Sequence, residues 1–190
     1  MDDLGETLRH AWACLERGVK DRRSPFHTPS VATIGLDGRP RMRTVVLRDV
    51  DPAARTLRFH TDLRGLKVAE IARDPRVALH GYDARAKLQI RVEGRAVIHA
   101  DEAVADEAWA GSRSMSRACY GVFPAPGTEM EEGGAFTLPG EEAEIDAGRS
   151  NFSAALIHAE RIETLYLDHA GHRRAVFDVA AGGAGRWLAP

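Results

Sequence analysis

Residues 41–50 read RMRTVVLRDV, and they follow the run VATIGL (31–36) and the pair Asp37-Gly38. Glycine supplies the positive φ that a tight turn needs, so the two apolar runs predict a β-hairpin about Gly38. Side chains alternate along a strand, which would divide its centre into two faces, with Arg43, Val45 and Leu47 on one and Thr44, Val46 and Arg48 on the other. Each face would therefore carry a cation, either solvated at a strand end or directed at an anion.

The runs around this hairpin predict further strands and a few helices. Apolar periodicity predicts helices from Asp2-Asp3 to about Gly18 and over 65–73, 101–112 and 114–123, the third capped by Asp101. Further strands are predicted over 57–61, 76–82, 87–99, 152–159, 162–168 and 173–179. Seven or eight strands with short connections indicate an α+β fold, an antiparallel β-barrel with peripheral helices.

The whole chain is expected to form one domain. Its 190 residues, 44% of them hydrophobic, can bury one sizeable core. Residues 124–150 are rich in Gly, Pro and Glu and poor in large apolar residues, so they are expected to form a long surface loop.

Composition argues against nucleic-acid and membrane partners. The net charge is -2 and the sequence pI is about 6.4, which gives no general attraction to nucleic acid. No apolar run approaches the ~18 residues of a bilayer span, and the first residues are acidic where a signal peptide would be basic. Cys14 and Cys119 form no CxxC pair. We therefore expect a cytoplasmic protein without a membrane or nucleic-acid partner.

Motifs for metal binding and serine hydrolysis are weak. The eight histidines include no pair at helical i, i+4 spacing, and His169 and His172 lie in an expected turn without a set of Cys or carboxylate ligands. No metal site is expected. Ser114 and Ser116 lack the G-x-S-x-G pattern of a nucleophile elbow.

Five short motifs in a fixed order carry a family resemblance. They are RTVVLR (43–48), FHTD (59–62), GLK (65–67), DPR (74–76) and QIRVEG (89–94), followed by IETLYLDHAGHRRAVFD (162–178) and RWLAP (186–190). This succession resembles the pyridoxamine 5'-phosphate oxidase-like family, the split barrels that bind flavin mononucleotide (FMN). The segments SMSRACYG (114–121) and PAPG (124–127) look like its divergent FMN-binding branch.

The resemblance implies FMN as the cofactor and names the residues that would hold it. Arg43, Thr61 and Lys67, with the helix start near Gly65, would bind the phosphate, which favours cations, hydroxyl groups and helix amides. The backbone of 45–47 and the Gln89 amide would border the ring. The implied cofactor set is Arg43, Thr44, Val45, Val46, Leu47, Arg48, His60, Thr61, Lys67, Gln89 and Arg174.

The implied substrate site consists of Arg48, Ser116 and His172, and no catalytic residue is assigned. Several family residues differ here: Gly65-Leu66 replaces Ser-Arg, Leu165 replaces a flavin-stacking tryptophan, and Ala170 replaces a substrate arginine. The arginine that would hold the substrate phosphate would fall on Ser112 or Arg113, depending on the gap. Arg64 is a candidate to compensate for the hydroxyl and guanidinium groups that Gly65-Leu66 lacks at the FMN phosphate. These departures predict poor turnover of pyridoxamine 5'-phosphate.

Three kinds of function remain open, and a homodimer is expected. The first is an FMN-dependent oxidoreductase that acts on an unidentified small molecule; the others are a non-catalytic flavin carrier or sensor, and a haem-binding relative of the fold. One barrel is expected to supply Arg43, Thr61, Lys67 and Gln89, whereas His172 and Arg174 would come from the second copy of a homodimer with two flavins at its interface.

Overall fold

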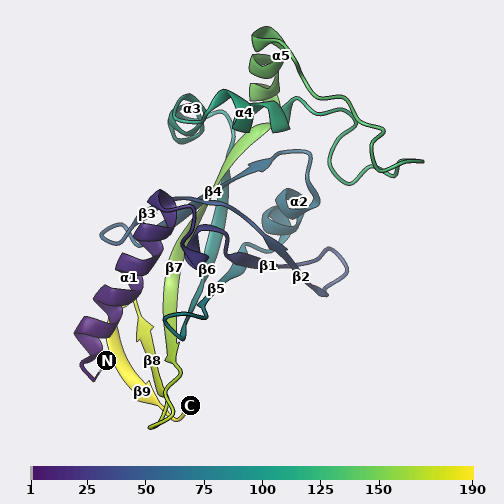
Figure 1. Ribbon diagram of the computed structural model, residues 1–190. Helices are drawn as coiled ribbons and strands as arrows, with labels where there is room; N and C mark the ends of the chain where they lie inside the picture. Colours follow the sequence, from purple (N-terminus) through teal and green to yellow (C-terminus); the bar gives the residue numbers. More distant parts are fainter. Residues whose placement is uncertain (1) are drawn as a thin grey trace.

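Nine strands of the described chain, residues 2–190 of the computed structural model, form one antiparallel sheet that curls into a split barrel (Figure 1). The strands are β1 (Ser30–Ile34), β2 (Pro40–Thr44), β3 (Leu47–Asp51), β4 (Thr56–Asp62), β5 (Arg76–Asp83), β6 (Leu88–His99), β7 (Phe152–Tyr166), β8 (Arg173–Asp178) and β9 (Ala184–Leu188). Their order is β2-β1-β5-β6-β7-β4-β3, and β8 pairs with both β7 and β9. The predicted α+β antiparallel split barrel with peripheral helices is confirmed.

The expected single strand over 41–50 is wrong, because the chain breaks at Val45-Val46 into β2 and β3. These two strands lie at opposite ends of the sheet order, β2 beside β1 and β3 beside β4. The Val45 amide donates to the Pro29 carbonyl at 3.0 Å, and the Val45 side chain is buried. Because the chain changes strands at this link, Arg43 and Arg48 belong to different strands.

The two predicted strands over 152–159 and 162–168 are instead one strand, β7. Strand β6 follows one edge of β7 along its length, while β4 and then β8 share the other edge. The pairing register shifts between Glu93 and Gly94 of β6, where Glu160 of β7 is an extra residue without a register partner. This bulge interrupts the side-chain alternation along β7, which is why the sequence did not show that the strand is continuous. A Cβ on Gly94 would lie 2.1 Å from the His158 carbonyl oxygen, so only glycine fits there.

Five α-helices lie around the sheet: α1 (Leu4–Lys20), α2 (Leu66–Arg73), α3 (Ala103–Ala110), α4 (Ser114–Arg117) and α5 (Glu142–Ala147). Single 3-10 turns occur at Pro25–His27, Ala118–Tyr120 and Gly148–Asn151. Asp3 caps α1 by accepting from the Glu6 amide. The expected cap Asp101 is wrong, since α3 starts one residue later, after Glu102, without a side-chain cap.

The expected loop over 124–150 is only partly irregular. It projects from the barrel in Figure 1 and then forms α5, which begins with a capping box between Glu141 and Glu144. The sequence analysis missed this helix because its six residues are too few to show apolar periodicity.

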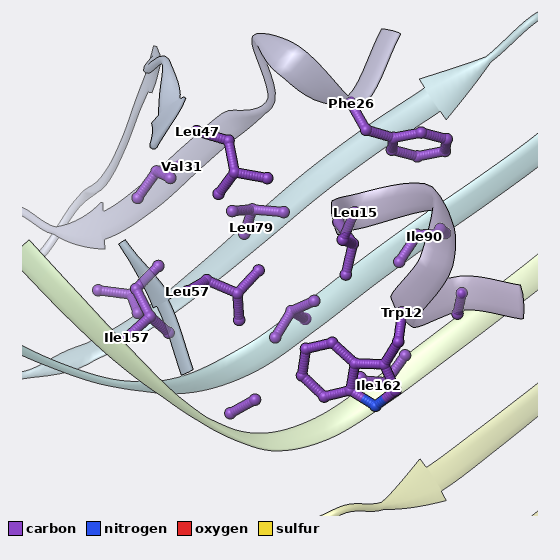
Figure 2. Close-up of a cluster of buried hydrophobic side chains, with 14 of the residues drawn as sticks. Trp12, Leu15, Phe26, Val31, Leu47, Leu57, Leu79, Ile90, Ile157 and Ile162 are labelled. Atoms are coloured by element: carbon purple, nitrogen blue, oxygen red, sulfur yellow. The ribbon is translucent and has the colours of Figure 1, made fainter. Parts of the chain in front are cut away.

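The main core lies between α1 and the inner face of the sheet (Figure 2). Trp12 and Leu15 of α1 point at this face, where Leu57, Ile90 and Ile157 are wholly buried. A smaller cluster under α3 consists of Ala105, Ala108, Trp109, Phe152 and Ala154. Within residues 2–190, no helix is both long and apolar enough to pass through a bilayer.

Candidate functional site

A buried carboxylate fixes the first arginine of the opening motif. Arg43 on β2 donates from Nη2 to Glu70 Oε2 at 2.6 Å and from Nη1 to Thr33 Oγ1 at 2.5 Å. The Thr33 hydroxyl donates in turn to Glu70 Oε2 at 2.6 Å. The side chain of Glu70 is only 5% exposed and that of Arg43 is 23% exposed. This network joins β1, β2 and α2 and holds one edge of the Arg43 guanidinium.

A second cation lies beside this network at the start of α2. Lys67 Nζ donates to Thr61 Oγ1, at the end of β4, over 2.9 Å. Burial lowers the pKa of Lys67, and the nearby positive charge of Arg43 lowers it further. Gly65 precedes the helix and makes no side-chain cap, so the first amides of α2 have no side-chain acceptor there.

These groups together form a corner that fits a phosphate monoester. Arg43 and Lys67 supply two positive charges and Glu70 one negative charge, while Thr61 supplies a hydroxyl group. A phosphate that carries nearly two negative charges matches such a donor set at a helix start. The structure thus brings together three of the residues that the resemblance assigned to the FMN phosphate.

Arg48, the second arginine of the motif, lines a separate cavity of about 260 Å³. The cavity lies between the end of α1, strands β3 and β4, and helices α3 and α4. Its lining includes Ser116, which the resemblance assigned to the substrate site. It also includes five cationic side chains against one carboxylate: Lys20, Arg22, Arg48, Arg58 and Arg113 against Glu107. Ser112 and Arg113, the two candidate positions for the substrate-phosphate arginine, both line this cavity.

Two polar atoms of the cavity lining are buried without a hydrogen-bond partner within the described chain. They are Nε of Arg58 and Nε2 of His60, two residues apart on the same face of β4. Burial, and then the charges of Arg48 and Arg58, lower the pKa of His60 to about 3, so its imidazole is neutral near pH 7. His60 faces this cavity, whereas Thr61 faces the barrel interior.

Aromatic rings support the wall beneath His60. The His60 ring packs edge-on against Phe152, with 4.9 Å between the ring centroids. The Phe152 centroid lies 5.3 Å from that of Trp109 and 4.9 Å from that of Tyr120. Arg117 lies 5.1 Å from the Trp109 ring centroid and donates to the carbonyls of Trp109 and Ala110. Arg117 therefore fixes the end of α3 rather than facing the cavity.

Arg64 also has a structural role. It forms a two-point contact with Asp62 and donates to the carbonyls of Tyr120 and Val122. Its donors are thus directed at the chain itself, which does not support the expectation that Arg64 compensates for the missing residues at the phosphate corner.

The remaining predicted residues lie at the opposite end of β7. Thr61 pairs with Ser153, whereas Leu165 pairs with Gln89 on one side and Arg174 on the other. Positions 153 and 165 are twelve residues apart, on the order of 40 Å of strand at ~3.3 Å per residue. The expectation that Gln89 shares a pocket with Thr61 inside one barrel is therefore wrong. Gln89 belongs with Arg174.

The immediate partners of these distant residues are charged or polar. Arg174 contacts the buried carboxylate of Glu163 at 3.1 Å, and Gln89 Oε1 lies 3.2 Å from His80 Nε2. His172 is exposed and its Nδ1 accepts from the Asp168 amide at 3.1 Å. Within one chain, His172 is therefore not part of the cavity that contains Arg48 and Ser116.

The other predicted positions lie in the link between the two arginines. Val45 and Leu47 are buried in the main core, Val46 is half-buried and Thr44 is exposed. Sequence reasoning missed Thr33, Glu70, Arg58, Lys20 and Arg22. Alternation of Arg58 and His60 on one strand face was the available signal for the cavity, while the buried Glu70 gave none.

Comparison with known proteins identifies the family. Residues 9–100 match the family model described as pyridoxamine 5'-phosphate oxidase, FMN-binding domain, and this stretch contains both arginines, Thr61 and Lys67. The chain belongs to the pyridoxamine 5'-phosphate oxidase-like family. Pyridoxine/pyridoxamine 5'-phosphate oxidase 2 of Arabidopsis thaliana is 28% identical over 165 residues, which cover 82% of this chain and 80% of that protein. A pyridoxine/pyridoxamine 5'-phosphate oxidase of Sphingopyxis alaskensis is 31% identical over 69% of this chain and 64% of its own.

Solved structures show the same fold at low identity. A pyridoxamine 5'-phosphate oxidase-related, FMN-binding protein from Nostoc punctiforme aligns with a TM-score of 0.74 and 19% identity, covering 100% of this chain and 99% of its own. PhzG from Burkholderia lata, solved with tetrahydrophenazine-1-carboxylic acid, aligns with a TM-score of 0.71 and 18% identity, covering 98% and 92%. These likenesses extend the family's split barrel to the C-terminal strands beyond residue 100.

Proposed function

We propose that this member of the pyridoxamine 5'-phosphate oxidase-like family is an FMN-dependent oxidoreductase that acts on a small anionic molecule. The observation that carries the proposal is the corner of Arg43, Thr61 and Lys67 at the uncapped start of α2. Burial, and then the positive charge of Arg43, lower the pKa of Lys67, which makes the charged form of Lys67 less favourable there. A bound dianion reverses that penalty.

FMN, when bound, would supply the capacity to accept a hydride, and the protein would supply orientation and charge. Arg43 and Lys67 would fix the phosphate end. Arg48 lies on the other side of the Val45-Val46 link, in the cavity with Ser116, and its cation would attract an anionic substrate. The carboxylic acid bound to the PhzG relative is an anionic ligand on the same fold, which supports this substrate class.

The proposed functional unit is a homodimer in which each flavin is shared. Gln89 and Arg174 lie together but far from Thr61 within one chain, so the ring contacts implied by the resemblance require a second copy. A two-fold interface would place Gln89 and Arg174 of each chain beside the phosphate corner of the other. His172 would reach the cavity of Arg48 and Ser116 in the same way.

Cofactor binding tests the proposal directly. The purified protein is expected to be yellow with a flavin spectrum and to be reduced anaerobically by a suitable donor, whereas a flavin carrier would not turn over and a haem-binding relative would show a haem spectrum. Dissociation constants for FMN and riboflavin, which lacks the phosphate, are then compared in wild type, Lys67→Gln and the matched surface variant Lys87→Gln.

Lys67→Gln removes a charge-assisted contact worth roughly 1.5 to 3 kcal/mol, so FMN affinity should fall about ten- to hundredfold while riboflavin affinity stays the same. Lys87→Gln removes the same charge from an exposed position and should change neither value. Unchanged FMN affinity in both Lys67→Gln and Arg43→Gln would overturn the assignment.

A further inference from the structure

We infer that the cavity beside Arg48 takes a substrate with two separate anionic groups, and that Arg58, Lys20 and Arg22 recognise the second group. This inference rests on the proposed function, because it names the substrate class of the same site. The first group would meet Arg48, Arg113 and Ser116, which come from β3 and from α4 and its start. The second would meet β4 and the end of α1.

The charge of the lining exceeds what one anionic group requires. Five cations less one carboxylate leave four positive charges around about 260 Å³. Among residues 2–190, the charged ends of Lys20, Arg22, Arg48 and Arg113 form no ion pair, and Arg58 has only Asp49 at 3.8 Å. Even a phosphate dianion at Arg48 would leave two positive charges uncompensated. Clustered like charges repel one another, and a second anion relieves that repulsion.

The unpartnered atoms show where the second group would bind. Buried polar atoms nearly always have hydrogen-bond partners, yet Arg58 Nε and His60 Nε2 have none in the described chain. Both side chains line the cavity from the same face of β4. The charged head of Arg58 also has no close acceptor in the described chain, since its distance of 3.8 Å to Asp49 is beyond hydrogen-bond range. An oxygen-rich anion would supply the missing acceptors for Arg58.

The size of the cavity fits a small molecule of this class. Small-molecule pockets usually have volumes of ~300 to 1,000 Å³, so a cavity of about 260 Å³ suits a compact ligand. Two small anionic groups joined by a short linker would fill that space. A compound with one anionic group and a long apolar part would leave Arg58 and His60 without partners and place carbon against five cations.

Titration calorimetry on the FMN-loaded protein tests the inference with two probes of equal size. The probes are 2-phosphoglycolate, which carries a phosphate and a carboxylate, and its carboxamide, which carries only the phosphate. Wild type should bind the acid at least about tenfold more tightly than the amide, as expected for one additional charge-assisted contact. Arg58→Gln and the double variant Lys20→Gln/Arg22→Gln should each reduce this preference to below about threefold, with little change for the amide.

Arg23→Gln is the matched control, because the Arg23 side chain is 96% exposed and lies outside the cavity lining. It should leave the preference unchanged. Thermal unfolding checks each variant, and the double variant at the exposed end of α1 carries the test if Arg58→Gln does not fold. The flavin spectrum of each sample reports separately on FMN binding. Equal binding of acid and amide by wild type, or a preference that survives both cavity variants, would overturn the inference.

Discussion

Glu70 holds Arg43 in place through an ion pair of 2.6 Å between Glu70 Oε2 and Arg43 Nη2. The carboxylate is almost fully buried, and the only other group that donates to it in the described chain is the hydroxyl of Thr33. Glu70 thus acts on the proposed phosphate site in two opposite ways. It orients one cation, and it cancels part of the positive charge.

Substitution of Glu70 separates these two effects. Glu70→Ala should lower the free energy of unfolding by about 2 kcal/mol, less than for a fully buried pair because Arg43 is 23% exposed, and should weaken FMN binding more than riboflavin binding. Glu70→Gln keeps an acceptor for Arg43 and raises the net charge of the corner, so FMN should bind as tightly as in wild type or more tightly. Ligand fluorescence and urea unfolding measure these changes. A loss of FMN affinity in Glu70→Gln equal to that in Glu70→Ala would show that orientation is not Glu70's contribution.

The neutral His60 makes stability depend on pH. Its pKa is about 3 in the folded protein against an ordinary value of 6.5, so between these values the unfolded chain takes up a proton that the folded chain does not. Stability should therefore decrease as the pH falls from 6.5 towards 3, by up to about 1.4 kcal/mol per pH unit from this residue.

Urea unfolding of His60→Gln between pH 6.5 and 4 checks that dependence. The variant should show a shallower decrease in stability than wild type, whereas His169→Gln, whose side chain is 95% exposed, should follow wild type. Parallel curves for wild type and His60→Gln would mean that His60 is protonated in the folded state.

The proposed sharing of each flavin between two chains predicts that mixed dimers recover FMN binding. Lys67→Gln and Arg174→Ala should each weaken FMN binding, but a dimer with one chain of each type keeps one site with both wild-type residues. Random mixing would restore about a quarter of all sites. Co-expression of the two variants with different affinity tags, followed by flavin quantification of the purified mixed dimer, measures this recovery. A 20.7 kDa monomer with stoichiometric FMN, or mixed dimers without recovered sites, would contradict the arrangement.

Pyridoxamine 5'-phosphate should be a poor substrate. Ala170 provides no guanidinium where the family has a substrate arginine, and the cationic cavity lining would repel the protonated aminomethyl group of that compound. Steady-state oxidation of this compound should give a kcat/KM below about 10⁴ M⁻¹ s⁻¹, at the lower limit of ordinary enzymes. An Ala170→Arg variant should raise this value. Efficient turnover by wild type would show that the missing arginine is not needed.

Sequence reasoning located most elements of the fold because their patterns are local. The periodicity of α1, the Asp74-Pro75 stop after α2 and the turn at Gly38 each depend on a few neighbouring residues. Sequence reasoning failed where contacts between residues far apart in the sequence determine the bounds of a strand. The break at Val45-Val46 coincides with burial of Val45 against the barrel. The continuity of β7 depends on its pairing with β6, because a bulge at Glu160 interrupts the alternation in its own sequence.

The candidate site shows the same division. Arg43, Thr61 and Lys67 could be grouped from ordered motifs, since family spacing encodes their proximity. Gln89 was placed with the wrong group because strand register, which separates it from Thr61, cannot be read from one sequence. Arg58 and the end of α1 were missed because a cavity lined by five separate elements has no motif.

The Val45-Val46 link fixes the number of residues between the proposed phosphate corner of Arg43 and the cationic cavity of Arg48. It crosses from one end of the strand order to the other, with Arg43 two residues before it and Arg48 two residues after it, and the Val45 amide is anchored to Pro29. One inserted residue would shift β2 or β3 by a position and turn an arginine to the opposite face. If the proposed sites are correct, replacing side chains on β4 and α1 should therefore alter substrate preference while the distance between the proposed phosphate corner and the cavity of Arg48 stays constant.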